Sequence, residues 1–251
     1  MLYSRALRVA PPPIMHSATP NRLTRLTRHI GAFRNFLGYS CAFTLAEVLI
    51  TLGIIGVVAA LTMPSLIANH KQKEASARLK KFYSIMSQAI LFSENENGPA
   101  GEWDKAEMDV TDPDTGEYSD NDAINTEEFF NKYLKQYIIY LKTEKDTKTK
   151  LFKFILNDGS TVMLRNGSCT DFIFDYNGEK KPNENGRDIY RFLLCPSGEK
   201  GRPGGKFITY RNDADNTREK KLIRCKSTPI TCSSLLEHDD WEFKEDYPFK
   251  P

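Results

Sequence analysis

The sequence predicts an α+β protein in which a long N-terminal helix leads into a head with one further helix and an antiparallel β-sheet. Three observations predict this class. Apolar residues run almost without interruption through residues 43–67, and apolar residues spaced by three and four continue to about residue 95. From residue 151 onward, short stretches rich in β-branched and aromatic residues alternate with turn residues. Helices followed by an antiparallel sheet are typical of the α+β class.

The first 42 residues differ in charge from everything after them. They hold six arginines, no lysine and no acid. Of the 35 basic side chains, 29 therefore remain against 33 acids, which gives the rest of the chain a formal charge of about −4. A mildly acidic body does not indicate nucleic-acid binding, and no nucleic-acid partner is expected. We predict a basic leader over 1–42 (Met15 is an alternative start), a membrane helix over 43–96, and an extracytoplasmic head over 97–251; the resemblance described below implies that the leader is removed and that the helix serves assembly.

The apolar run from 43 to 67 is long enough to cross a membrane, since about 20 helical residues suffice. Its one ionisable side chain is Glu47. The large aliphatic residues favour insertion by about 4 kcal/mol in total, against roughly 3 kcal/mol for the buried acid. Insertion is therefore favoured by a narrow margin. The six preceding arginines predict a cytoplasmic N-terminal side, although lysines and an arginine also follow the run.

Two simpler interpretations explain the same basic and apolar succession. One is an ordinary secretory signal peptide, and the other is a plain signal anchor. Neither gives a role to an acid five residues into the apolar run. From the composition alone, both stay open beside an assembly helix.

The ten residues from Cys41 read Cys-Ala-Phe-Thr-Leu-Ala-Glu-Val-Leu-Ile. They resemble the cleavage and methylation signature of the type IV prepilin and type II secretion pseudopilin family. That signature is a small residue, Phe, Thr, Leu, any residue, Glu and then an apolar run. Ala42 stands where the family usually has Gly. Pro64 extends the resemblance, because pilins commonly carry a proline about five turns into this helix.

The resemblance implies a pilin-like fold and a defined maturation. A prepilin peptidase would cut between Ala42 and Phe43, and the new amine of Phe43 would be N-methylated. Glu47 would then pair with the Phe43 ammonium of a neighbouring subunit. A lone carboxylate in hydrocarbon is costly, and a nearby opposite charge favours its ionised form. The alternative is a protonated Glu47 without an assembly role.

The resemblance also implies partners and a location. The partners would be other pilin-like subunits, the prepilin peptidase, an inner-membrane assembly platform and membrane lipid. The protein would cross the bacterial inner membrane once, with its N-terminus cytoplasmic and its head extracytoplasmic, and would join a filament after assembly.

The helix that begins at residue 43 is expected to continue to about residue 95, before the stop signal Asn97-Gly98-Pro99. Its length would be roughly 80 Å at ~1.5 Å per residue. Pro64 is the expected helix break, since a proline removes one backbone donor and costs about 3 kcal/mol. This stretch either melts or bends when subunits leave the bilayer, or is a static kink. The apolar stripe beyond the span is expected at Leu79, Phe82, Met86, Ala89, Ile90 and Ser93.

The head is expected to begin with an acidic loop and one helix. Residues 97–124 carry several acids that could bind Ca²⁺, but their spacing does not fit an EF-hand, and a solvated loop is favoured. Asn125 and Glu128 predict a capping box for a helix over 125–142. Strands are expected at 151–156, 161–164, 171–176 and 189–194, with a weaker one at 206–210 and a hairpin turn at 157–160.

The head contains four cysteines: Cys169, Cys195, Cys225 and Cys232. An even set in an exported domain predicts two disulfides with three alternative connectivities. The alternative is four buried thiols. Zinc is disfavoured, because no two of them have the short spacing of a structural zinc pair.

One loop could hold a cation through Asp175, Asn177 and Asp188. It resembles a loop recurring in pilin-like heads, and its oxygens are the hard ligands that Ca²⁺ prefers. The alternative, a turn stabilised by Asx and glycine chemistry, is favoured. No other cofactor is expected.

The predicted function is structural, a subunit of a type II secretion pseudopilus that supports protein secretion. The alternative is a type IV pilin or minor pilin for adhesion, motility or DNA uptake. A membrane-anchored extracytoplasmic enzyme is the less favoured class, because His238 is the only histidine in the head and no catalytic motif appears. Four head aromatics are expected to be core residues rather than a DNA-stacking platform, namely Phe129, Tyr137, Tyr140 and Trp241.

Overall fold

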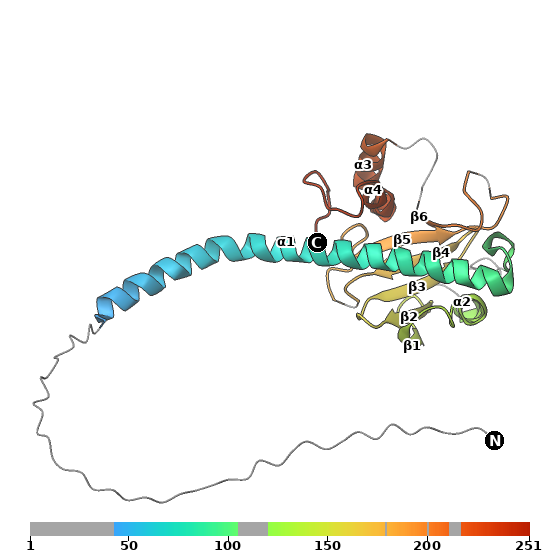
Figure 1. The fold of residues 1–251 in the computed structure, drawn as a ribbon, viewed down its shortest axis with the longest axis horizontal. Coiled ribbons are helices and arrows are strands. Elements are labelled where there is room, and N and C mark those ends of the chain that lie inside the picture. Colours follow the sequence, from blue (N-terminus) through green and yellow to red (C-terminus); the bar gives the residue numbers. More distant parts are fainter. Residues whose placement is uncertain (1–42, 105–119, 179, 200, 211–216) are drawn as a thin grey trace, which may run out of the picture. The chain divides into compact units, whose positions relative to one another are not determined.

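The computed structural model describes residues 43–104, 120–178, 180–199, 201–210 and 217–251 (Figure 1). The chain divides into a unit of residues 1–49 and a unit of residues 50–251, and each is described by itself. The predicted leader, Ala42 and Cys41 lie outside the described residues, as does most of the acidic loop.

The long N-terminal helix is present as α1, Leu45–Asn97. It ends close to the predicted stop, where Gly98 adopts a positive φ of 73° and Pro99 follows. The Gly98 amide donates to the carbonyl of Glu94 and so satisfies one of the last helical carbonyls. Pro64 lies inside the helix, which runs through it without a break.

The sheet has six antiparallel strands in sequential order, so the predicted antiparallel sheet is confirmed. Five strands match the predicted ones within one or two residues, and the first was not predicted. The Asn157–Ser160 turn joins two of them, with Gly159 at a φ of 81°. The strands are β1 Tyr140–Lys145, β2 Phe152–Leu156, β3 Thr161–Asn166, β4 Thr170–Asp175, β5 Ile189–Leu194 and β6 Phe207–Thr209.

The further helices differ from the prediction in number and extent. The second helix, α2, spans Asp120–Tyr133, so it begins before the predicted cap Asn125, which lies within the helix, and it does not reach residue 142. The chain turns after Tyr133 and then pairs with β2 as the edge strand β1, whose backbone hydrogen bonds replace helical ones. The head also contains α3, Arg218–Ser227, and α4, Cys232–His238. Short 3-10 turns occupy Ala100–Glu102 and Pro229–Thr231.

The core of the second unit lies between α1 and the sheet, which α1 crosses in Figure 1. The buried face of α1 is the predicted stripe together with Ala75. Phe82 lies at its centre, stacked on Phe174 of β4 at 4.1 Å between ring centroids and packed edge-on against Phe192 of β5 at 5.1 Å. Burying one such ring stabilises the fold by roughly 1.5–3 kcal/mol. The stripe is therefore what fixes α1 to the head.

The aromatic residues expected in the core are there. Phe129 and Trp241 are buried, and Tyr137 and Tyr140 are partly buried against the same cluster. Trp241 lies 5.2 Å from Tyr83 of α1 between ring centroids, which ties the segment after α4 to the helix.

Both predicted disulfides are present, so the alternative of four free thiols is wrong. Cys169–Cys195 joins the residue before β4 to the residue after β5, with an S–S distance of 2.02 Å. Cys225–Cys232 joins α3 to α4 across the second 3-10 turn. Each bond closes a local loop within the head.

Candidate functional site

The candidate assembly site lies at the start of α1, where Thr44 and Glu47 bind one another. The Thr44 amide donates to Glu47 Oε2 at 2.8 Å, and the Thr44 hydroxyl donates to the same oxygen at 2.9 Å. The Glu47 amide donates to Thr44 Oγ1 at 3.2 Å. This reciprocal arrangement is a capping box, with Thr44 as the N-cap. Sequence reasoning missed it, although the Thr-x-x-Glu spacing carries the signal.

Glu47 keeps capacity for a further partner beyond this cap. A carboxylate has two oxygens with about four acceptor positions, and the Thr44 bonds use Oε2. Oε1 accepts no hydrogen bond from the described part of the chain. Phe43 is 86% exposed, directly before the cap. One residue thus closes the helix end and still has a carboxylate oxygen that accepts no hydrogen bond from the described residues.

The predicted span is exposed on all sides. Its large apolar side chains between 43 and 67 are 42–86% exposed. Within the described residues, α1 is the one helix long and apolar enough to cross a membrane, and its most apolar window has no buried residue. An all-round apolar helix needs apolar surroundings, and nothing in the described chain supplies them for this stretch.

Polar side chains flank Pro64 and bond back to the helix. The Thr62 hydroxyl donates to the Val58 carbonyl at 3.0 Å, and the Ser65 hydroxyl donates to the Thr62 carbonyl at 3.0 Å. The helix is continuous at Pro64, where a break was expected. A melting of this stretch during assembly stays a prediction.

The structure brings Asp175, at the end of β4, close to Asn177 and Asp188 of the loop that follows, but the two carboxylates accept hydrogen bonds from the chain itself. Asp188 is fully buried and accepts from the Asn183 amide at 2.7 Å, the Glu184 amide at 2.5 Å and the Asn177 side-chain amide at 3.3 Å. Asp175 accepts from the Asn177 amide at 3.0 Å. These bonds build the loop itself.

Burial and hydrogen bonding act in opposite directions on the pKa of Asp175. Burial, with a contribution from the neighbouring Asp188 charge, raises the pKa of Asp175 to about 7. The described residues hold no group of three His, Cys, Asp or Glu side chains arranged for a metal ion. Ca²⁺ takes six to eight oxygen ligands, which these two occupied carboxylates fit poorly. The favoured alternative, a turn held by Asx and glycine chemistry, accounts for the bonds, and calcium stays a prediction. The acids at 105–119 lie outside the described residues.

Taken together, these features define an α+β protein with a disulfide-bonded head and one candidate membrane helix. The family of unknown function DUF6613 matches residues 65–251, and the chain belongs to it. The match covers the head and the packed part of α1, and begins after the prepilin-like motif and most of the apolar run. No curated protein and no solved structure matches the chain.

Proposed function

We propose that this protein is a pilin-like subunit of a membrane-assembled filament. The preferred filament is the pseudopilus of a type II secretion system, and the alternative is a type IV pilus in which the protein is a pilin or minor pilin. The observation that carries the proposal is the start of α1. There a single acid caps an exposed, all-round apolar helix and retains an oxygen without a hydrogen bond in the described chain.

The physical argument concerns the surroundings of the apolar stretch. In the bilayer, lipid covers these side chains. In a filament, the same stretches of neighbouring subunits cover one another, and Glu47 then leaves water. A desolvated carboxylate stays ionised only beside a cation and is otherwise protonated, and the trimmed amine of the next subunit's Phe43 is such a cation. A subunit out of register would leave a buried charge unpaired, so the pair would set the axial position.

A set of variants at the start of α1 tests the proposal. Glu47→Val and Glu47→Gln should still insert into the membrane but should be lost from sheared filaments. Thr44→Val removes the cap hydroxyl and leaves the carboxylate, so it should reduce filament yield far less. Glu74→Gln, on the same helix beyond the span, is the matched control for loss of an acid. Filament yield from Glu47→Val equal to that of the unmodified protein would contradict the proposal.

The choice between the two filaments needs a different readout. Deleting the gene should reduce the amount of secreted protein in the culture medium for a pseudopilus subunit. For a type IV pilin it should instead remove surface filaments and the motility, adhesion or DNA uptake that depends on them.

A further inference from the structure

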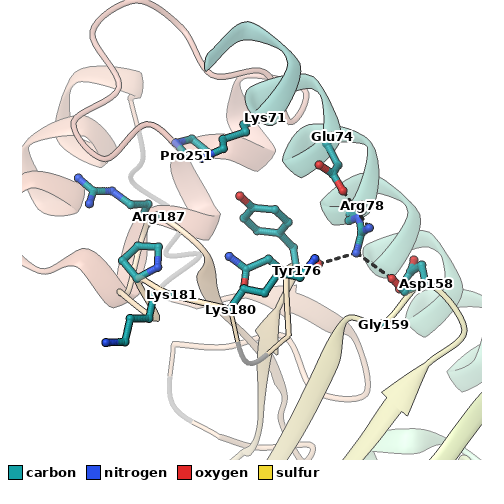
Figure 2. A pocket seen from close by; sticks show the side chains of 12 residues that line it. Lys71, Glu74, Arg78, Asp158, Gly159, Tyr176, Lys180, Lys181, Arg187 and Pro251 are labelled. Carbon is teal, nitrogen blue, oxygen red and sulfur yellow. Dashed lines mark hydrogen bonds and ion pairs between the residues drawn. The ribbon is translucent and has the colours of Figure 1, made fainter. Parts of the chain in front are cut away.

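A cavity of about 330 Å³ lies where α1 enters the head. Three of its walls come from segments that are far apart in the sequence, namely α1, the β2–β3 turn and the β4–β5 loop, and Pro251 completes the lining beside Lys71 (Figure 2). Basic side chains dominate its lining, with five cations against two acids. The cations are Lys71, Arg78, Lys180, Lys181 and Arg187, and the acids are Glu74 and Asp158.

The two acids are already neutralised by cations of α1. Glu74 pairs with Arg78 at 2.8 Å, and Asp158 pairs with Lys81 at 3.1 Å. Arg78 is also fixed as part of the wall, because it donates to the carbonyls of Asp158 at 3.0 Å and Tyr176 at 2.8 Å. Figure 2 shows this guanidinium joining the helix to both loops. The acids therefore do not cancel the remaining cations.

Four cationic side chains retain unused donors. Lys71, Lys180 and Lys181 make no hydrogen bond or ion pair with the described residues, and Lys180 and Lys181 are exposed. Arg187 pairs with Glu184 at 2.8 Å through one nitrogen, while its buried Nε has no partner among the described residues. An unpartnered buried donor is destabilising, so an acceptor at this position would be favoured. The chemistry of the cavity thus suits an anion with several oxygens.

The position of the cavity along α1 indicates which anion is close. Lys71 follows the last residue of the apolar run, Ile67, by four residues, or about 6 Å along the helix. The headgroup layer on each side of a bilayer is about 5–8 Å thick. With the run embedded in the hydrocarbon, Lys71 lies at the level of the lipid phosphates, and Lys180 and Lys181 line the same cavity from the β4–β5 loop.

We infer that this cavity binds the phosphate of an anionic phospholipid headgroup while the subunit is anchored in the membrane. The inference rests on the membrane anchoring in the proposed function and adds a specific lipid contact to it. Lys71, Lys180 and Lys181 supply the charge, and Arg78 holds the three walls in place. Basic residues at a membrane surface typically contribute about 1 kcal/mol each to attraction by anionic lipid, or about fivefold in affinity.

The test uses the full chain in vesicles of phosphatidylcholine and phosphatidylglycerol, with retained lipid identified by native mass spectrometry. The unmodified protein should retain phosphatidylglycerol in preference to phosphatidylcholine. The triple variant Lys71→Gln, Lys180→Gln, Lys181→Gln should lose most of that preference. The matched control is Lys135→Gln, Lys148→Gln, Lys206→Gln, which removes three exposed lysines elsewhere in the head and should keep it. Equal preference in the unmodified protein and the first triple variant would overturn the inference.

Two further arms separate the alternatives. Adding inorganic phosphate at constant ionic strength should leave the retained lipid unchanged, because phosphate does not share the membrane anchor. Displacement of the lipid by phosphate would show that the cavity takes free phosphate, and would overturn the lipid assignment. Resistance of the protein to alkaline extraction reports insertion separately. Insertion without a lipid preference contradicts only the cavity inference, whereas failure to insert contradicts the anchoring as well.

Discussion

The two halves of α1 belong to one helix, but they differ in whether the rest of the chain covers their apolar side chains. Between residues 43 and 67, the large apolar side chains point in all directions and are 42–86% exposed. Between residues 75 and 93, one helix face is buried against the sheet with 0–3% exposure, whereas Leu91 and Phe92 on the other side stay exposed. The buried face of the second half thus finds its apolar partner inside the subunit. The first half finds none among the described residues, and the proposed function assigns that role to lipid and to neighbouring subunits.

The family match follows the same division. It covers residues 65–251, which include the packed half of α1 and the whole head, and it leaves out most of the exposed half. The head and its stripe form the unit that the match describes. The proposed assembly role depends on the part that the match does not cover, so it needs its own experiments.

The largest difference between the two halves is expected when one apolar side chain is truncated in each. Phe82→Ala should destabilise the head by about 3–5 kcal/mol, because the ring is 1% exposed and stacked on Phe174. Leu66→Ala, in the exposed half, should leave the head's stability within about 0.5 kcal/mol. Denaturant unfolding of the detergent-solubilised full chain measures both. A similar loss in the two variants would show that the halves do not differ as described.

Removing a disulfide should weaken only the packed unit. Replacing Cys169 and Cys195 together by serine opens a loop with a sequence separation of 26 and should cost about 3.5 kcal/mol. Replacing Cys225 and Cys232 opens a separation of only 7 and should cost about 2.4 kcal/mol. Unfolding midpoints give the order, and both variants should insert into membranes as well as the unmodified protein does. The reverse order would contradict the loop-closure argument.

The pH dependence of the head should contain a contribution from Asp175. Its folded pKa of about 7 lies above the ordinary value of 3.8, so the folded state holds its proton more tightly than the unfolded state. This contribution is fully present below pH 4 and is lost as the pH rises through about 7. We expect a loss of about 4 kcal/mol, measured as unfolding free energy against pH. Asp175→Asn should flatten that part of the profile, and an unchanged profile would rule the contribution out.

The smallest expected effect is that of calcium on the loop between β4 and β5. Asp188 already accepts three hydrogen bonds there, so the loop is held without an ion. Neither Ca²⁺ nor a chelator should shift the unfolding temperature measurably. A rise with Ca²⁺ that disappears in Asp188→Asn would establish the calcium site and overturn the hydrogen-bonded account.

Periodic patterns in the sequence predicted much of the fold. The stripe from Leu79 to Ser93 is buried as predicted. It could be predicted because residues spaced by three and four lie on one face of a helix. The strand at 189–194 has the predicted bounds, and the hairpin turn at 157–160 follows from its Asn-Asp-Gly-Ser sequence.

Elements whose secondary structure depends on contacts with residues far away in the sequence were not predictable in the same way. Residues 138–141 fit the apolar face of a helix, but pairing with β2 makes 140–145 a strand. The helices α3 and α4 are short, and α3 is mostly polar. The basic cavity gathers side chains from around residues 71, 158 and 180, so only the tertiary structure brings them together. Of the assembly site, the residue types were predictable from the resemblance, whereas the Thr44–Glu47 cap emerged from the structure.

The central claim is that the exposed half of α1 begins, in the mature subunit, with a free and modified Phe43. Mass spectrometry of the N-terminal peptide from protein purified out of the host's membrane or filaments tests it directly. The proposal predicts a peptide that starts at Phe43 and carries one methyl group on its amine. A peptide that starts elsewhere, or a subunit that retains the arginine-rich leader, would contradict it.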